Sequence, residues 1–88
     1  MKIQEGFILK EVAGSYVVVP IGENLVDFSA MITLNETGAF LWEQLQSEKT
    51  IIELVDNLLQ EYNVDRPTAE VDVSEFVQTL RNEKLLIE

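Results

Sequence analysis

The segment that most constrains the fold is Ile32–Trp42, where an extended run passes directly into a helix. Leu34 ends the extended run. Asn35 is a residue type that caps helices, because its side chain accepts a hydrogen bond from a backbone N–H that lacks an intrahelical partner. Gly38 and Ala39 leave little side chain in the first turn, so another backbone can approach it closely. The apolar residues that follow recur at the spacing of one helix face: Gly38, Leu41, Trp42 and Leu45. The chain is therefore predicted to change here from strands to helices.

Upstream of this junction, the sequence predicts a β-hairpin. Gly6–Val12 and Tyr16–Val19 are apolar and rich in β-branched residues, and Pro20 ends the second run. The short segment Ala13–Ser15 separates the two runs and contains Gly14, which can take a positive φ in a turn. The spacing of the two runs is typical of paired antiparallel strands.

Two further extended segments are predicted between the hairpin and the junction. Leu25–Phe28 is predicted to be a short strand or arm, and Ser29–Ala30 interrupts it. Met31–Leu34 is predicted to be the third strand. Because side chains alternate along a strand, Ile32 and Leu34 share one face. We expect that face to point toward the core, since Leu34 comes directly before the buried helix.

The first two helices follow the junction. The first is predicted over about Glu36–Gln46. Thr50 and Glu53 have the spacing of a capping box, in which each side chain bonds to the other residue's backbone N–H, so they begin the second helix. Asn63 is predicted to end it. The apolar stripe of the second helix comprises Ile51, Val55, Leu58, Leu59 and Tyr62.

The third helix is predicted to start at Asp65–Thr68. Its apolar face comprises Ala69, Val73, Phe76, Val77 and Leu80. The apolar tail Leu85–Ile87 is expected to pack on the core or to add a strand. This order predicts an α+β fold, a winged-helix-like domain of three N-terminal antiparallel β-strands followed by three α-helices. Residues 1–88 are expected to form a single domain.

Composition limits the class of protein. The hydrophobic fraction of 47% is that of a folded domain rather than a disordered chain. No apolar run approaches the ~20 residues that a membrane-spanning helix needs, and the N-terminus Met1–Glu5 has no apolar core segment or small-residue cleavage site of a signal peptide. The absence of cysteine means that no disulfide is expected, which agrees with a cytoplasmic location. No membrane partner is expected.

The charge balance limits the partners. Sixteen Asp and Glu residues against six Lys and Arg residues give a formal net charge of −10. Nucleic-acid binding depends on cations that replace phosphate counterions. The cations here are few and scattered along the chain: Lys2, Lys10, Lys49, Arg66, Arg81 and Lys84. We therefore expect no nucleic-acid partner, and an acidic surface favours a basic or apolar one.

The residue types present also limit the chemistry. Without histidine and cysteine, the usual zinc sites, Cys/His pairs and Ser-His-Asp triads are unavailable. The four glycines lie far apart, so there is no glycine-rich phosphate loop. The acidic residues of the helices have the pattern of solvated amphipathic faces rather than of paired catalytic carboxylates. We expect no enzymatic activity, no metal and no cofactor.

Three residues allow both a structural and a ligand-binding interpretation. Asp72 lies between Val71 and Val73, beside the apolar face of the third helix. It is interpreted as either a solvated or capping carboxylate, or as an anchor for an amide or a cation of a bound partner. Trp42 and Phe40 on the first helix are expected to belong to the core and its rim rather than to a ligand pocket.

Several segments of the chain form a pattern when taken together. They are Gly6–Lys10, Tyr16–Pro20, Leu34–Trp42, Asp72 and Val73 with Phe76 and Leu80, and Leu85–Leu86. This pattern resembles the PqqD family, whose fold is also called the RiPP recognition element, and the resemblance covers Gly6–Glu88. Lys84 departs from the family pattern, which usually has glycine before the final pair of leucines, and this concerns the C-terminal cap of the third helix.

The resemblance implies a peptide chaperone without catalysis of its own. Such proteins bind the leader of a ribosomally made precursor peptide and present the precursor to a modifying enzyme, often a radical S-adenosylmethionine (SAM) enzyme. In the family, the leader adds as a strand to the third strand and lies in a groove beside the third helix. Carried onto this sequence, the implied peptide-binding residues are Met31, Ile32, Thr33, Leu34, Asp72, Val73, Phe76, Val77 and Leu80.

Two other functions were considered. A winged-helix transcriptional regulator would bind DNA, which the net charge disfavours. An acidic carrier protein needs a serine directly after an aspartate at a helix start, whereas Asp27–Met31 lacks that dipeptide and leads into a strand. The exposed edge of the third strand also allows two copies of the chain to pair, so a monomer or a weak dimer is expected.

Overall fold

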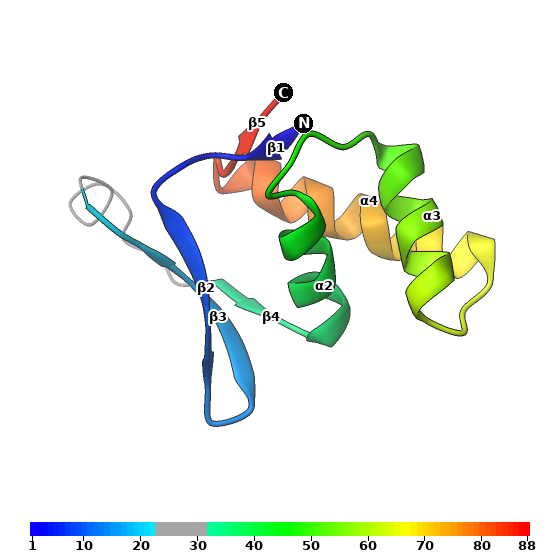
Figure 1. Cartoon of the computed structure of the whole chain (residues 1–88), viewed down its shortest axis with the longest axis horizontal. Helices are drawn as coiled ribbons and strands as arrows, with labels where there is room; N and C mark the ends of the chain where they lie inside the picture. Colours follow the sequence, from blue (N-terminus) through cyan, green and yellow to red (C-terminus); the bar gives the residue numbers. More distant parts are fainter. Residues whose placement is uncertain (23–31) are drawn as a thin grey trace.

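The computed structural model describes residues 1–22 and 32–88. Three antiparallel strands precede three helices, which confirms the predicted α+β class, and a short strand lies at each end of the chain (Figure 1). The predicted strand or arm at 25–28, its interruption at 29–30 and Met31 lie outside the described residues. The elements are β1 (Lys2–Ile3), β2 (Phe7–Val12), β3 (Ser15–Pro20), β4 (Ile32–Leu34), α2 (Glu36–Gln44), α3 (Ile51–Glu61), α4 (Arg66–Asn82) and β5 (Leu86–Ile87).

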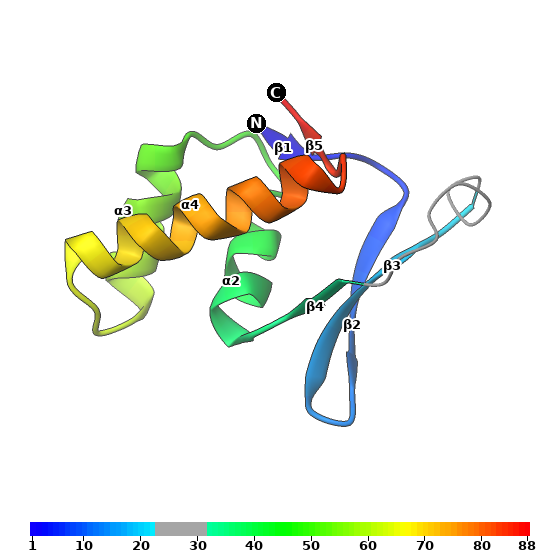
Figure 2. The same cartoon turned by 180° about the vertical axis from the view of Figure 1, so that it is seen from behind.

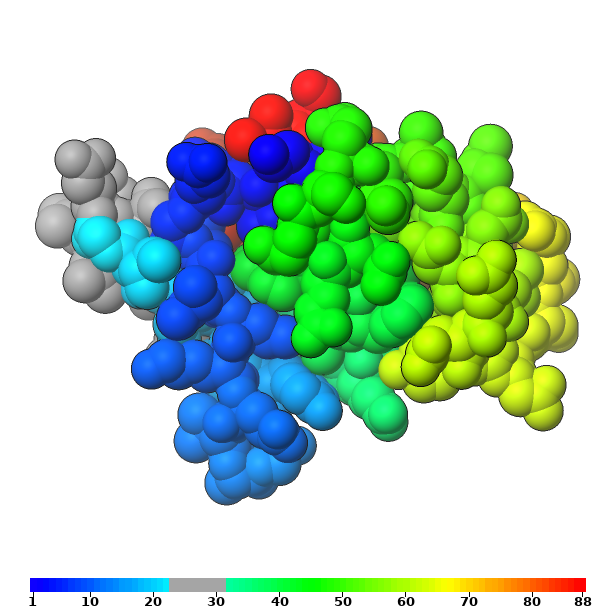
Figure 3. Space-filling view, viewed as in Figure 1, coloured from blue at the N-terminus to red at the C-terminus, as the bar shows by residue number. Residues whose placement is uncertain are grey.

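The main sheet has the strand order β2-β3-β4, and both pairings are antiparallel. The hairpin turn is shorter than predicted, because Ser15 pairs with Val12 and leaves only Ala13 and Gly14 in the loop. Both loop residues have positive φ, 51° at Ala13 and 83° at Gly14. Positive φ at both positions is what a type I′ turn requires, one of the two-residue turns whose twist matches that of a hairpin. The hairpin projects beyond the helical part of the molecule (Figure 3).

A second, two-stranded sheet joins the chain ends. Lys2 pairs with Ile87 and Ile3 with Leu86, antiparallel, so β1 and β5 lie side by side in Figures 1 and 2. The two alternatives for the tail both occur, since Leu85 is fully buried and the next two residues form a strand. The sequence analysis did not assign the partner strand β1.

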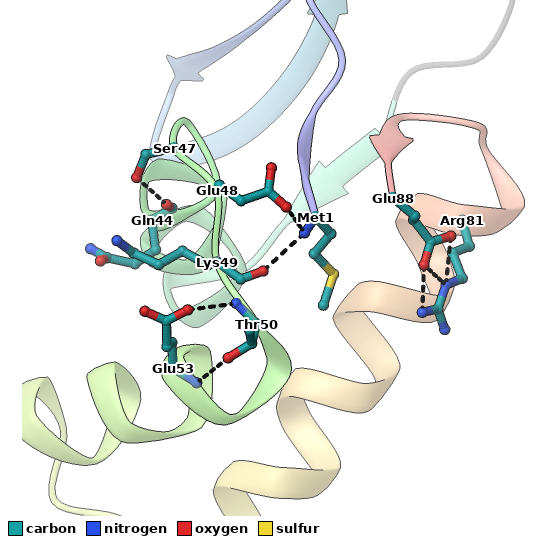
Figure 4. A network of polar contacts seen from close by, with 9 residues as sticks. All are labelled: Met1, Gln44, Ser47, Glu48, Lys49, Thr50, Glu53, Arg81 and Glu88. Carbon is teal, nitrogen blue, oxygen red and sulfur yellow. Dashed lines mark hydrogen bonds and ion pairs between the residues drawn. The ribbon is translucent and has the colours of Figure 1, made fainter.

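Polar contacts fasten β1 to the segment between α2 and α3 (Figure 4). The backbone N–H of Ile3 donates to the carbonyl of Leu45 at 2.9 Å, and that of Lys49 donates to the carbonyl of Met1 at 2.9 Å. The amino group of Met1 also pairs with the carboxylate of Glu48. The N-terminal residues therefore close one end of the core.

Helix α2 begins as predicted. The side chain of Asn35 accepts a hydrogen bond from the backbone N–H of Gly38 at 2.8 Å. The helix ends at Gln44, two residues earlier than predicted. There the chain tightens into a turn of 3₁₀ type, because the N–H of Gln46 donates to the carbonyl of Glu43, only three residues before it.

The capping box of helix α3 is confirmed, with Thr50 and Glu53 satisfying each other's backbone N–H groups. The helix ends at Glu61, two residues before the predicted end, because Tyr62 already has extended backbone. The predicted stripe is wrong at one position, since Ile51 is 40% exposed while the unassigned Leu54 is fully buried. Ile51 is the first residue of α3 and lies one turn before Leu54, where the buried face of the helix begins.

Helix α4 has the predicted start and the predicted face. Asp65 caps it by accepting from the backbone N–H of Thr68 at 3.0 Å. The five residues of the predicted apolar face are all buried: Ala69, Val73, Phe76, Val77 and Leu80. The periodicity of the sequence therefore identified the packed side of this helix.

The C-terminus of α4 shows how Lys84 is accommodated. Glu83 is the C-cap, and Lys84 takes φ = 60°, the left-handed conformation that favours glycine. The N–H of Leu85 donates to the carbonyl of Leu80 at 2.9 Å, and that of Lys84 to the carbonyl of Arg81 at 3.0 Å. These two bonds form the Schellman motif, which ends many helices with glycine at this position.

One hydrophobic core joins the sheet to the helices. Leu34 reaches it from β4, whereas Thr33 between Ile32 and Leu34 is exposed, which confirms the predicted inward face of this strand. Trp42 on α2 is 3% exposed, as predicted. The described residues contain no buried polar side chain. No described helix is long and apolar enough to cross a membrane.

Candidate functional site

Strand β4 is an edge strand within the described sheet. It pairs with β3 on one side, and its other side carries no strand of the described chain. Figure 2 shows β4 leading into α2, and α4 crosses in front of α2 in this view. An edge strand presents unpaired backbone N–H and C=O groups to any chain that can lie alongside it. This side of the molecule is therefore able to accept a further strand.

A pocket of about 340 Å³ opens where β4, the start of α2 and the middle of α4 meet. Strand β4 and the cap of α2 supply one wall, and α4 supplies the other. The residues that line the pocket are Thr33, Leu34, Asn35, Thr37, Gly38, Leu41, Asp72, Glu75, Phe76 and Thr79. Elements far apart in the sequence thus converge on one hollow beside the sheet edge.

The apolar part of the pocket is made by Leu34, Leu41 and Phe76, each at most 8% exposed. Gly38 lies against this part, and a Cβ atom there would be 3.2 Å from both the Cβ of Leu34 and the Oδ1 of Asn35. The glycine therefore lets the end of β4 pack closely on the first turn of α2. The close approach that the sequence predicted at this turn comes from the residues directly before the helix.

The α4 wall of the pocket is acidic. Asp72 is half-buried and Glu75 is exposed. They are three positions apart, which places both on one face of the helix. The ion pairs of the described residues lie elsewhere and join Glu48 to Met1, Asp56 to Arg66 and Glu88 to Arg81. The residues that line the pocket include no Lys or Arg, so neither carboxylate is neutralised by a described residue.

The structure divides the predicted peptide-binding residues into three groups. Thr33, Leu34, Asp72 and Phe76 are brought together around the pocket. Ile32 lies on the same strand and is half-buried, and Met31 is outside the described residues. The remaining three face the core with at most 1% exposure and do not line the pocket: Val73, Val77 and Leu80.

Six lining residues were not singled out from the sequence as peptide-binding residues: Asn35, Thr37, Gly38, Leu41, Glu75 and Thr79. On α4 a signal was available, because Asp72, Glu75, Phe76 and Thr79 follow the i, i+3, i+4, i+7 spacing of one helix face. That face lies beside the buried face and contains polar residues. On α2 the sequence contains no local pattern that predicts which residues line the pocket, since this depends on how closely α4 approaches.

The perturbed carboxyl groups lie at helix caps and at one surface ion pair. The backbone N–H of Thr50 lowers the pKa of Glu53, and hydrogen bonding from Thr68 lowers the pKa of Asp65. Hydrogen bonding with Arg81 lowers the pKa of Glu88. Burial raises the pKa of Tyr62. Its ring packs edge-on against that of Phe40, with 5.6 Å between the ring centroids. None of these residues lines the pocket, and the described residues contain no group of three or more His, Cys, Asp or Glu that could hold a metal.

Two known structures have a similar fold. "TbiB1 in Complex with the TbiA(beta) Leader Peptide" is 31% identical and has a TM-score of 0.75, with 98% of this chain and 94% of that chain covered. "Lasso peptide synthetase B1 complexed with the leader peptide" is 20% identical, with a TM-score of 0.72 and coverage of 99% and 96%, a likeness of fold. No curated protein matches the chain.

A family model gives the assignment. The model for PqqD, described as coenzyme PQQ synthesis protein D, matches residues 7–86, which is nearly the whole chain. The match includes the junction of β4 and α2 and all of α4, the elements that form the pocket. The chain belongs to the PqqD family.

Proposed function

We propose that this protein is a RiPP recognition element that binds the leader of a ribosomally made precursor peptide. The leader lies along β4 as an added strand and places side chains in the adjacent pocket. The observation that carries this proposal is the position of the pocket, which opens between the β4 edge of the described three-stranded sheet and helix α4. The leader peptides named in the two similar structures support the same class of ligand.

Strand addition suits this site physically. Backbone hydrogen bonds to the β4 edge provide affinity that does not depend on the peptide sequence, and side-chain pockets provide the choice between sequences. A volume of about 340 Å³ is at the lower end of the range for small-ligand sites, so it holds one or two side chains rather than a folded domain. Of the nine residues implied by the family resemblance, the four that line the pocket are proposed to contact the peptide directly: Thr33, Leu34, Asp72 and Phe76.

The protein itself is proposed to be non-catalytic and to deliver the bound precursor to a modifying enzyme, such as a radical SAM protein, in the cytoplasm. It is proposed to act as a monomer, or as a weak dimer in which two copies pair through the β4 edge. Pairing of that kind covers the same edge as the leader, so peptide binding and dimerisation compete.

The proposal is tested by nuclear magnetic resonance with a candidate precursor peptide, chosen from short peptides encoded by neighbouring genes. We expect its leader to shift the backbone amide signals of β4 and of α4 around Phe76 and to leave those of the hairpin turn at Ala13 unchanged. Addition of a strand should also slow hydrogen exchange at the β4 amides that face the peptide. Shifts confined to the hairpin or to α3 would refute this site.

A further inference from the structure

We infer that the pocket selects a peptide in which a basic side chain stands two positions from an apolar one, with the basic group held by Asp72 and Glu75. The inference rests on the proposed function, because it assumes that the peptide lies as a strand along β4. It adds the class of residue that the site recognises. The apolar residue is the anchor, and the basic residue is the one that the acidic wall distinguishes.

The first step concerns the two carboxylates. Residues three apart on a helix have Cβ atoms about 5–6 Å apart, so one ammonium or guanidinium group can lie near both. Asp72 and Glu75 have no ion-pair partner among the described residues, and all six Lys and Arg residues of the chain belong to the described part. The chain as a whole carries a formal net charge of −10. A cation from outside is therefore the group that this wall lacks.

The second step concerns the apolar part of the same pocket. Phe76 directly follows Glu75 and lines the same pocket as Leu34 and Leu41. A charged group placed against these three side chains would lose hydration without gaining a partner. An apolar side chain of the peptide suits this place, and a basic one suits the place beside the carboxylates.

The third step is the spacing between the two places. Side chains of a strand that point to the same side are two residues apart, or about 6.6–6.8 Å. The α4 wall from Asp72 to Thr79 covers about 10 Å, because a helix rises ~1.5 Å per residue. The wall is long enough for two such side chains and too short for many more. The recognised pattern is therefore apolar-x-basic, or the reverse if the peptide runs in the opposite direction.

The contribution of the two carboxylates to peptide affinity depends on how exposed they are. Glu75 is exposed and Asp72 is half-buried, so water screens their attraction for a cation. Exposed ion pairs contribute little, and removal of either charge should weaken binding by about fivefold at most. The backbone and the apolar anchor then remain the main sources of affinity, and raising the salt concentration to physiological levels should weaken binding only modestly.

The experiment starts from a displayed library of random short peptides and selects those that bind the whole protein. The same selection is made with the double variant Asp72→Asn/Glu75→Gln and with Glu70→Gln, which removes an exposed α4 carboxylate that does not line the pocket. We expect peptides with the apolar-x-basic pattern from the parent protein and from Glu70→Gln. The double variant should retain the apolar position and lose the preference for Lys or Arg.

A matched pair of synthetic peptides then separates charge from hydrogen bonding. One carries the selected Arg, and the other carries citrulline, which retains N–H donors but is neutral. The Arg peptide should bind the parent protein several-fold more tightly in fluorescence anisotropy, and the two should bind the double variant equally, with native Trp42 emission showing that the variant is folded.

The outcomes are distinct. Enrichment of apolar residues with no basic preference, or equal binding of the Arg and citrulline peptides to the parent, would overturn the inference and leave strand addition intact. If no peptide were enriched, both the proposed function and the inference about the basic side chain would fail.

Discussion

Replacement of Lys84 by glycine should stabilise this protein. Lys84 has φ = 60°, and a residue with a Cβ atom is strained in that conformation by about 1–2 kcal/mol. Glycine removes the strain but gives the unfolded chain more freedom, which offsets about 0.5–1 kcal/mol. The net gain in the free energy of unfolding is about 0.5–1 kcal/mol. For a domain of this size, that corresponds to a rise in Tm of about 2–8 °C.

The side chain of Lys84 makes the comparison clean. It is exposed and forms none of the ion pairs of the described residues, and its backbone N–H keeps its bond to the carbonyl of Arg81 in either variant. Thermal unfolding followed by circular dichroism measures the change. Lys84→Ala is the matched control, because alanine removes the charge and the long side chain but retains the Cβ atom.

The reasoning is refuted if Lys84→Ala raises Tm as much as Lys84→Gly, since the gain would then come from the lost charge rather than from the backbone. It is also refuted if Lys84→Gly lowers Tm. The position does not line the pocket, so neither variant should change peptide affinity.

Three further predictions concern the core and a cap. Trp42, the single tryptophan, is 3% exposed, so its emission should shift to the red on unfolding, and a native maximum typical of an indole in water would contradict the packing of α2. Val77→Ser should lower the free energy of unfolding by about 2–3 kcal/mol in urea titrations, because it removes buried methyl groups and buries a hydroxyl, whereas Gln78→Ser on the exposed side should have little effect. The pKa of Asp65 is lowered from its usual 3.8, so its cap stabilises the fold fully above that value and loses this effect as the pH falls through the folded pKa. Asp65→Asn keeps a cap that does not titrate. The Tm of this variant relative to that of the parent should therefore rise as the pH falls from about 5 to about 2. If the two proteins lost Tm in parallel over this range, the carboxylate of Asp65 would not contribute the pH-dependent stability.

Local chemistry determined where the helices begin. Asn35, Thr50 and Asp65 each satisfy a backbone N–H within three residues, so their role depends on few distant contacts and was predicted correctly. The buried face of α4 was predicted for a similar reason, because a 3.6-residue period shows which side of a helix is apolar. The resemblance to the PqqD family added the fold and the class of ligand.

Tertiary structure alone decided the rest. The pairing of β1 with β5 joins residues at opposite ends of the chain, and two-residue strands have no periodicity from which to predict them. Ile51 and Leu54 both fit the apolar period of α3, and only the packing of the folded chain leaves the first exposed and the second buried. The pocket has the same origin. Glu75 is one of many acidic helix residues in the sequence, and it lines a candidate binding site because α4 crosses beside the edge of β4 that carries no described strand.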